Sequence, residues 1–185
     1  MIKKELTKRI FSSLILIPSV FFVVTVGSYL FNLFILICFL ITSYEWHMMS
    51  RKKSYYYLGF LFLIFSFYSA YEIRTSTVDG YEYFLIILLI CISTDIGGYF
   101  FGKFFKGPKL TKISPKKTYS GVIGGYLLSI LLLKLSLNYL YFFQDYQEIK
   151  LNIFIFILLI STVSQLGDIL ISYFKRLSKI KDTGK

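Results

Sequence analysis

Long runs of apolar residues most constrain what this chain can fold into. A helix needs about 20 predominantly apolar residues to cross the hydrocarbon core of a bilayer, and these runs are close to that length. The mean hydropathy is +0.65 and 56% of the residues are hydrophobic, so little sequence remains for a soluble domain. We expect an all-α, polytopic membrane helix bundle that forms one domain over residues 1–185. About six transmembrane helices are expected, at 10–26, 29–44, 55–71, 82–101, 120–142 and 151–174, with a tight turn at Gly27-Ser28 joining the first two.

The basic residues of the chain indicate its orientation. The formal net charge is +11, and the lysines and arginines gather in short blocks at the ends of apolar runs. Such blocks are typical of cytoplasmic loops that meet anionic headgroups, which favours the lipid bilayer over nucleic acid as the partner. The blocks fall on one side of the expected spans, so both termini are expected in the cytoplasm. Trp46 and His47, near the end of a span, are expected in an interfacial aromatic belt.

A row of polar residues follows one face of the last apolar run. At about 3.6 residues per turn, the following residues stack along one side of a helix: Ser161, Gln165, Asp168, Ser172 and Lys175. The same spacing continues to Lys179 and Asp182. A carboxylate in such a segment costs about 2.5–3.5 kcal/mol on insertion scales, so Asp168 requires a partner, a metal ion or a water-filled cavity. The row predicts that something polar or ionic is handled at the cytoplasmic edge of a membrane.

A second carboxylate, Asp95, lies near the end of the fourth expected span. Asp95, Gly98 and Gly102 share a helical face, and close helix packing accounts for the glycines without any function. Packing does not account for Asp95, which is expected to be buried without a basic neighbour on its own helix. Asp95 and Gln165 are therefore candidates for a polar cavity, which would also suit an ion path.

The basic loop that follows this span holds six lysines between residues 102 and 118. On charge alone it is an ordinary cytoplasmic loop. Its last part differs, because hydroxyl groups and paired lysines converge just before a helix in Ser114-Pro115-Lys116-Lys117-Thr118. Lysines supply charge and a helix N-terminus supplies free backbone N–H groups, so this mixture suits phosphate oxygens.

The C-terminal region combines acids with cations. Asp168 and Asp182 bracket Lys175, Arg176 and Lys181. Carboxylate oxygens beside cations suit Mg²⁺ bound to a triphosphate, because the metal bridges phosphate oxygens while the cations neutralise the leaving group. An ion path would not need a basic cluster at its mouth.

These segments resemble the phosphatidate cytidylyltransferase (CDP-diacylglycerol synthase) family. The residues from Ser172 through Lys175-Arg176 to Lys181-Asp182 look like the opening of the family signature, and Gln165-x-Gly167-Asp168 precedes it there. Other elements also fall in family order along the whole chain: Lys8-Arg9-Ile10 with Pro18, Glu45-Trp46, Asp95 with Gly98-Tyr99, and the Ser114-Pro115-Lys116-Lys117-Thr118 loop with Gly121 and Gly124-Gly125.

Two departures from the family pattern affect the predicted site. Ile171 stands where the family usually has a glutamate, so one acidic contact is missing. The sequence also stops at Lys185, before the His-Gly-Gly and Asp-Arg-x-x-Asp part of the signature and a final apolar stretch. The resemblance implies that those aspartates complete the metal site, and that this chain is a family member truncated at its C-terminus.

The resemblance implies the reaction CTP + phosphatidate → CDP-diacylglycerol + diphosphate, with Mg²⁺ as cofactor, at the cytoplasmic face of the cell (inner) membrane and in a homodimer. A phosphatidate oxygen would attack the α-phosphorus of CTP in line, so positioning and charge neutralisation carry the catalysis. The implied metal ligands are Asp168 and Asp182, the catalytic cations are Lys175, Arg176 and Lys181, and the substrate-binding residues are Ser114, Lys116, Lys117, Thr118 and Ser172.

Other functions stay open from the sequence. A non-enzymatic protein, either a transporter with Asp95 and Asp168 in an ion path or an inactive fragment, would not need Lys116 or Lys117. A membrane lipid-alcohol kinase would transfer the γ-phosphate of a nucleotide and release a nucleoside diphosphate. The identity of the product separates the kinase from the cytidylyltransferase.

Overall fold

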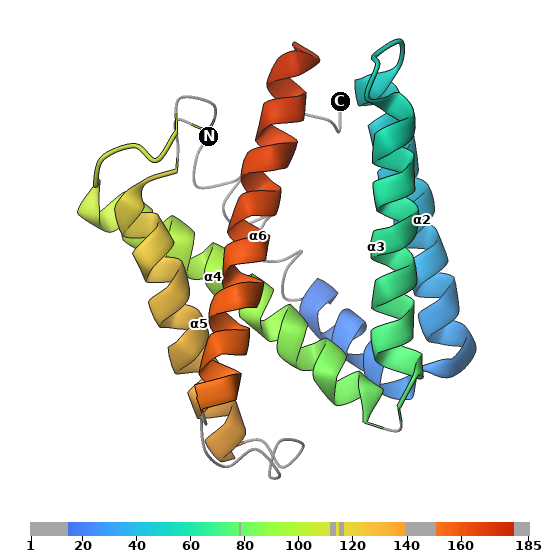
Figure 1. Ribbon diagram of the computed structural model, residues 1–185. Coiled ribbons are helices and arrows are strands. Elements are labelled where there is room, and N and C mark those ends of the chain that lie inside the picture. Colours follow the sequence, from blue (N-terminus) through green and yellow to red (C-terminus); the bar gives the residue numbers. More distant parts are fainter. Residues whose placement is uncertain (1–14, 78, 112–113, 115–116, 140–150, 180–185) are drawn as a thin grey trace. The chain divides into compact units, whose positions relative to one another are not determined.

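The computed structural model describes residues 15–77, 79–111, 114, 117–139 and 151–179. Within these ranges the chain forms helices and no β-strand. A short apolar helix, Ile15–Val26, is followed by α2 (Ser28–Ser50), α3 (Tyr56–Thr75), α4 (Gly80–Phe105), α5 (Tyr119–Tyr139) and α6 (Leu151–Leu177) (Figure 1). Helices α2 to α6 are long and apolar enough to cross a membrane. The predicted all-α, polytopic membrane bundle is confirmed.

The observed helices follow the predicted spans, with differences at their ends. The largest difference is in α2, which continues to Ser50 beyond the predicted end at residue 44. The extra turns contain Glu45 and His47, which lower the local hydropathy without interrupting the backbone hydrogen bonds of the helix. Apolar content marks the part of a helix that suits lipid, and the helix itself can extend further.

The chain divides into two compact units. Unit 1 consists of residues 1–44 and 58–85, and unit 2 consists of residues 45–57 and 86–185. Helices α2, α3 and α4 each contribute to both units. The single domain expected from the sequence stays a prediction.

Unit 1 contains a sharp reversal between its first two helices. Gly27 and Ser28 both adopt left-handed backbone conformations, with φ angles of 66° and 52°, which ends one helix and starts the next. Arg74 closes this turn, because its Nε donates a hydrogen bond of 2.7 Å to the carbonyl oxygen of Val24. The tight turn predicted at Gly27-Ser28 is confirmed.

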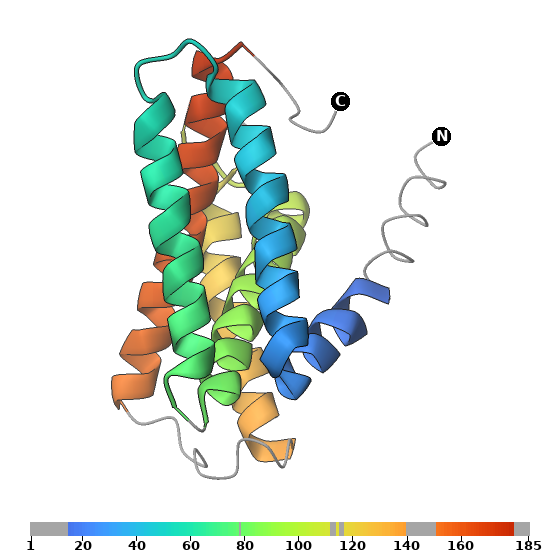
Figure 2. The same ribbon diagram turned by 90° about the vertical axis from the view of Figure 1, so that its right-hand side faces the viewer.

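Beyond this turn, α2 and α3 run side by side (Figures 1 and 2). Aromatic rings join them: the centroids of Phe39 and Phe67 are 5.5 Å apart in an edge-to-face arrangement. No described residue of α3 is buried within the protein. Its apolar side chains are therefore available to lipid.

Unit 2 packs α4, α5 and α6 closely through small residues. A Cβ atom on Gly97 would collide with the backbone of Gly124, and one on Gly125 would lie 3.0 Å from the carbonyl oxygen of Thr94. Figure 1 shows α5 beside α6. Gly98 and Gly102 both face Gly121, so the packing role predicted for these two glycines is confirmed.

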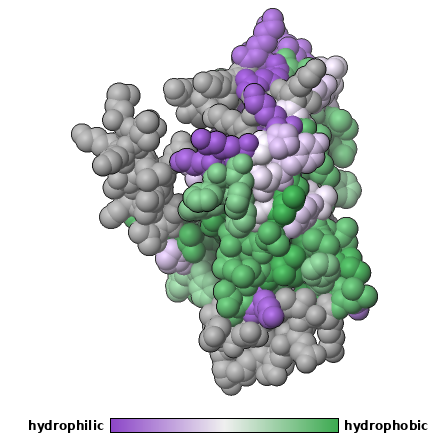
Figure 3. Space-filling model, turned by 90° about the vertical axis from the view of Figure 1, so that its left-hand side faces the viewer, coloured by the Kyte–Doolittle hydropathy of each residue, from purple (hydrophilic) through white to green (hydrophobic). Residues whose placement is uncertain are grey.

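Short polar side chains lie inside these helix contacts. Ser93, Thr94, Ser129 and Ser161 are at most 1% exposed. On the outside, hydrophobic residues form a broad band over the face drawn in Figure 3, and hydrophilic residues gather mainly toward the top of that view. An apolar exterior with polar groups inside the bundle is the arrangement that a bilayer favours.

Candidate active site

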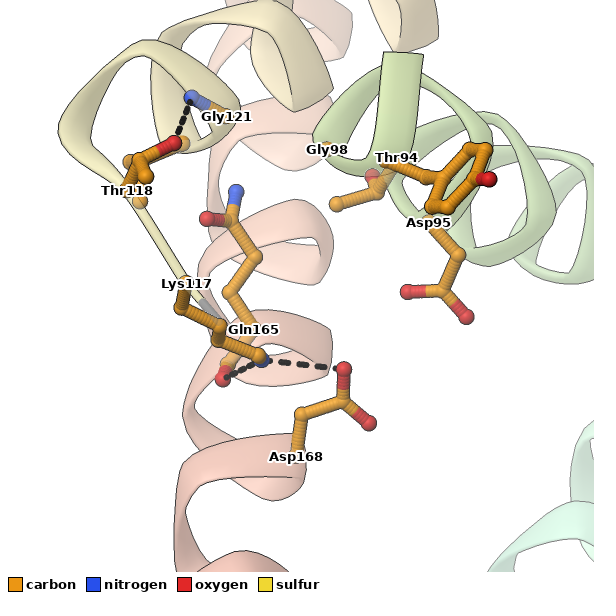
Figure 4. Close-up of a pocket in the computed structure, with 10 residues that line it drawn as sticks. Thr94, Asp95, Gly98, Lys117, Thr118, Gly121, Gln165 and Asp168 are labelled. Atoms are coloured by element: carbon orange, nitrogen blue, oxygen red, sulfur yellow. Dashed lines mark hydrogen bonds and ion pairs between the residues drawn. The ribbon is translucent and has the colours of Figure 1, made fainter. Parts of the chain in front are cut away.

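A pocket of about 220 Å³ lies within unit 2, where α4, the start of α5 and α6 meet. Its walls come from Thr94, Asp95, Gly98 and Tyr99 on α4, from Lys117, Thr118, Gly121 and Val122 at the start of α5, and from Gln165 and Asp168 on α6 (Figure 4). The volume is below the roughly 300–1,000 Å³ typical of small-molecule sites, which suits a polyphosphate group better than a whole nucleotide. The sequence predicted a polar cavity from Asp95 and Gln165, and both residues line this pocket.

An ion pair connects two separate sequence motifs inside the pocket. Lys117 Nζ lies 2.9 Å from Asp168 Oδ2 and donates a second hydrogen bond of 3.1 Å to the carbonyl oxygen of Gln165 (Figure 4). The side chains of Lys117 and Asp168 are 26% and 56% exposed, so both remain accessible from the pocket. Asp168 was expected to require a partner or a cavity, and the structure provides both.

Asp95 occupies a different environment from the one predicted. The buried face of α4 is formed by Ile90, Ser93, Thr94 and Gly97, and Asp95 lies beside that face. Its carboxylate is exposed and borders the same pocket as Asp168 (Figure 4). The expectation of a buried carboxylate is wrong, because the rotation of about 100° per residue that buries Thr94 turns Asp95 toward the opening.

The first turn of α5 is held by Thr118. The Thr118 Oγ1 atom accepts a hydrogen bond of 3.2 Å from Gly121 N–H, and its carbonyl oxygen accepts one of 3.1 Å from Val122 N–H. Upstream, Leu110 N–H donates to the carbonyl oxygen of Lys117 at 2.8 Å, which folds the loop back on itself. The positive end of a helix dipole therefore borders a pocket that also contains a lysine.

A polar bridge between α4 and α6 at the pocket was not predicted from the sequence. Thr94 Oγ1 donates a hydrogen bond of 2.9 Å to Ser161 Oγ, linking α4 to α6. Gln165 Nε2 donates to the same Ser161 oxygen at 3.4 Å. Ser161 and Gln165 were recognised by their helical spacing. The partner of Thr94 on α6 could not be predicted, because a threonine in an apolar run usually bonds to its own helix, as Thr94 also does to the carbonyl oxygen of Ile90.

The remaining predicted residues lie outside the pocket lining. Ser172 Oγ donates to the backbone oxygen of Asp168 at 2.7 Å, and the Ser114 backbone oxygen accepts from Lys117 N–H at 3.0 Å. Lys175 and Arg176 are in the last turn of α6, and Lys175 is seven residues beyond Asp168, or roughly 10 Å along the helix. Lys116, Lys181 and Asp182 lie outside the described residues.

The polar row on α6 does not continue as a helix. The helix ends at Leu177, and Lys179 has a left-handed φ of 57°. Hydrogen bonds from Ser178 N–H to Phe174 and from Lys179 N–H to Arg176 close this end. The predicted extension of the row to Lys179 is therefore wrong, because the chain turns before another helical repeat is completed.

Comparisons with known proteins agree with the motifs that form the pocket. The model of the cytidylyltransferase family matches residues 7–78 and 55–185. The chain is 32% identical to phosphatidate cytidylyltransferase of Rickettsia bellii, over 98% of this chain and 80% of the relative. It is 33% identical to the corresponding enzyme of Rickettsia typhi, over 98% of this chain and 81% of the relative. It is 38% identical to phosphatidate cytidylyltransferase of Staphylococcus aureus, over 70% of this chain and 45% of the relative. No solved structure matches the chain.

Proposed function

This chain belongs to the cytidylyltransferase family, and we propose that it is a membrane nucleotidyltransferase that transfers the cytidylyl group of CTP to phosphatidate. The products are CDP-diacylglycerol and diphosphate. The observation that carries the proposal is the Lys117–Asp168 pair, because it joins the loop motif and the α6 motif within one pocket. A carboxylate and a cation beside a helix N-terminus are suited to a metal-bound polyphosphate.

The proposed reaction is an in-line displacement at phosphorus. A phosphate oxygen of phosphatidate forms a bond to the α-phosphorus of CTP, and the bond from that phosphorus to the bridging oxygen of diphosphate breaks. The nucleophile is already an anion, so the protein has little proton transfer to perform. It has to hold two negatively charged substrates together and neutralise the charge on the departing diphosphate.

Mg²⁺ is the proposed cofactor, and the pocket contains groups that fit it. Asp95 on α4 and Asp168 on α6 both line the pocket and offer hard carboxylate oxygens. Within the described residues, no group of three or more His, Cys, Asp and Glu side chains could hold a metal. Mg²⁺ commonly binds through one or two carboxylates together with substrate phosphates and water, so two carboxylates are sufficient. Asp95 and Asp168 would hold the ion, which would supply positive charge to neutralise the phosphate groups.

Lys117 is proposed to change partners during substrate binding. It neutralises Asp168 in the structure, at a distance of 2.9 Å. A triphosphate that enters the pocket offers Lys117 stronger acceptors, and its departure leaves Asp168 free for the metal ion. Lys175 and Arg176 supply further positive charge from the last turn of α6, where they lie next to each other. They are the proposed cations for the leaving diphosphate.

The chain is a membrane protein, with helices suited to cross a bilayer. We propose that its site lies at the cytoplasmic face of the cell membrane. Basic residues occur where α4 ends, just before α5 begins and where α6 ends, which is the same side for successive membrane-spanning helices: Lys103, Lys117, Lys175 and Arg176. A homodimer is also proposed, and light scattering of the detergent-solubilised protein tests it.

The proposed function predicts a specific labelled product. Protein in lipid–detergent micelles is incubated with phosphatidate, Mg²⁺ and CTP labelled at the α-phosphorus, and labelled CDP-diacylglycerol is expected. Asp168→Asn should reduce the rate by about 10²-fold or more, since it removes charge at the metal and Lys117. Asp79→Asn, on the exposed turn before α4, is the matched control and should retain activity.

Three results would contradict the proposal. Label transferred from the γ-phosphate of a nucleotide to a lipid would indicate the kinase. Ion flux into vesicles without any lipid product would indicate the transporter. An unchanged rate in Asp168→Asn would remove Asp168 from the site.

A further inference from the structure

We propose that the connection between α2 and α3 positions the basic end of α6, through a cluster of Trp46, Tyr55 and Phe174. We call this cluster the aromatic clamp. Trp46 and Tyr55 are positioning residues, because they act on Lys175 and Arg176 by way of Phe174. The inference rests on the proposed function, since it assigns these two cations to the leaving diphosphate. All of the residues involved belong to unit 2.

The three rings of the aromatic clamp contact one another. The Trp46 ring centroid lies 5.3 Å from that of Phe174 and 6.0 Å from that of Tyr55. The centroids of Tyr55 and Phe174 are 5.0 Å apart. Aromatic pairs at these distances attract one another beyond the effect of burying their area. Two segments that are far apart in the sequence are thereby joined at one point.

Polar contacts fix the clamp in a single arrangement. Tyr55 Oη and Ser178 Oγ are 2.9 Å apart, which ties the connection to the residue that follows α6. Trp46 Nε1 donates a hydrogen bond of 3.0 Å to the carbonyl oxygen of Tyr56. Ser50, fully buried, donates to the carbonyl oxygen of Trp46 at 2.6 Å. Ring packing alone allows sliding, but the bond between Tyr55 and Ser178 joins the two segments and specifies their register. The bonds made by Trp46 hold its indole in place against the start of α3 and the end of α2.

Trp46 does not behave as a lipid-facing residue. Its side chain is only 8% exposed, and its indole N–H is satisfied by a protein carbonyl group. Residues of an interfacial belt direct their polar atoms toward headgroups and water. The belt position expected for Trp46 from the sequence is therefore wrong, because the indole is buried against α6.

The clamp acts directly beside the proposed cations. Phe174 immediately precedes Lys175 and Arg176, and successive residues of a helix differ in direction by about 100°. Fixing the ring of Phe174 therefore fixes the directions in which both cations leave the helix. Lys175 is half-buried and Arg176 is exposed, so packing by other groups constrains Arg176 less. A displacement of about 1 Å in a group that positions the substrate can reduce the rate by up to 10²-fold, so the placement of Lys175 and Arg176 matters for catalysis.

The kinetic test removes one hydrogen bond and retains every ring. Tyr55→Phe and Ser178→Ala should each lower kcat by about 3–10-fold and leave the KM for phosphatidate unchanged, and the double variant should resemble either single one. Tyr57→Phe is the matched control, because Tyr57 lies in the same region with 81% of its side chain exposed. The proposal would be overturned if Tyr55→Phe, Ser178→Ala and their double variant had the same kcat as the Tyr57→Phe control. It would also be overturned if the losses of the two single variants added up in the double variant.

A second measurement reports on position without using activity. Spin labels on Lys52→Cys and Lys179→Cys, with Cys38 and Cys91 replaced by serine, give the distance distribution between the connection and the end of α6. We expect a narrow distribution that broadens in Tyr55→Phe and in Trp46→Phe. A distribution that is already broad, or that neither variant changes, would overturn the clamp. A narrow distribution that broadens in these variants, in a protein with no cytidylyl transfer, would refute the proposed function and support the clamp as a structural contact.

Discussion

Units 1 and 2 differ in where their hydroxyl side chains find hydrogen-bond partners. In unit 1, Thr42 donates to the carbonyl oxygen of Cys38 at 2.8 Å, and Ser66 donates to that of Phe62 at 2.8 Å. Each of these bonds remains within a single helix. In unit 2, Thr94 bonds to Ser161 and Tyr126 bonds to Thr162, so hydroxyl groups cross from one helix to another. Hydroxyl groups of unit 2 also bond to carbonyl oxygens of their own helices, as Thr94 does to Ile90, but some of them connect helices in addition.

The spacing of the helices explains this difference. In unit 1, large rings such as those of Phe39 and Phe67 lie between α2 and α3. In unit 2, glycines allow the backbones to approach, so a short hydroxyl side chain can reach its partner on the next helix. The close approach of these backbones also leaves little room for larger side chains in unit 2. We therefore expect substitutions in unit 2 to disturb the site, whereas substitutions in unit 1 change stability and spare catalysis.

The largest effect is expected at the contact between α4 and α5. Gly97→Ala places a Cβ atom against the carbonyl oxygen of Gly124, so one helix has to move. Overpacking of this kind costs about 1–3 kcal/mol, and a shift of α4 displaces Asp95 from the pocket. Both the thermal stability and the rate of cytidylyl transfer should fall. A fluorescence melting curve and the labelled-CTP assay measure the two effects.

Gly167→Ala is the matched control for this substitution. Gly167 lies in α6, and a Cβ atom there would meet nothing within 4 Å. Alanine is preferred over glycine in a helix by about 1 kcal/mol, so this variant should be as stable as the parent or more so. Equal losses in both variants would show that the close approach at Gly97 is not the reason for its effect.

The sequence predicts the elements of this fold better than their contacts. Hydropathy placed the long helices, because a bilayer requires apolar runs of a certain length. Helical spacing placed Gln165 and Asp168 on one face, and both line the pocket. These properties depend on neighbouring residues in the chain, so they can be read without the structure.

The partner of each polar group could not be predicted in the same way. Lys117 and Asp168 are 51 residues apart, and several lysines were equally available to pair with that carboxylate. The Thr94–Ser161 bond depends on how α4 rotates against α6, which the small residues determine. The end of the polar row at Leu177 depends on a left-handed turn at Lys179, a non-glycine residue that gives no sequence signal.

A moderate effect is expected at Arg74, a polar side chain of unit 1 that does cross between helices. Its guanidinium donates to the carbonyl oxygens of Val24 and Thr25, at 2.7 and 3.4 Å, and so caps the first helix. Arg74→Met should cost about 1–2 kcal/mol, or roughly 2–8 °C in melting temperature. The kcat should change by less than about twofold, because Arg74 lies outside unit 2.

Arg74→Lys separates the charge of this side chain from its geometry. Lysine keeps the positive charge at the helix C-terminus but cannot reproduce the planar set of donors, so an intermediate melting temperature is expected. A large loss of kcat in Arg74→Met would contradict the division of roles between the two units.

The smallest effect is expected at the bridge between Thr94 and Ser161, and it tests most directly whether crossing hydroxyl groups stabilise unit 2. Ser161→Ala removes the hydroxyl that receives the hydrogen bond from Thr94, whereas Ser66→Ala removes a hydroxyl that bonds within α3. Hydrogen bonds between membrane helices are worth about 0.6 kcal/mol on average. Ser161→Ala should therefore lower stability by about that amount, and Ser66→Ala should leave it unchanged.

Thr94→Val combined with Ser161→Ala should cost less than the sum of the two single changes, because both remove the same bond. Equal losses in Ser161→Ala and Ser66→Ala, or full additivity of the pair, would mean that the crossing hydroxyls of unit 2 hold its helices no more firmly than the local ones of unit 1.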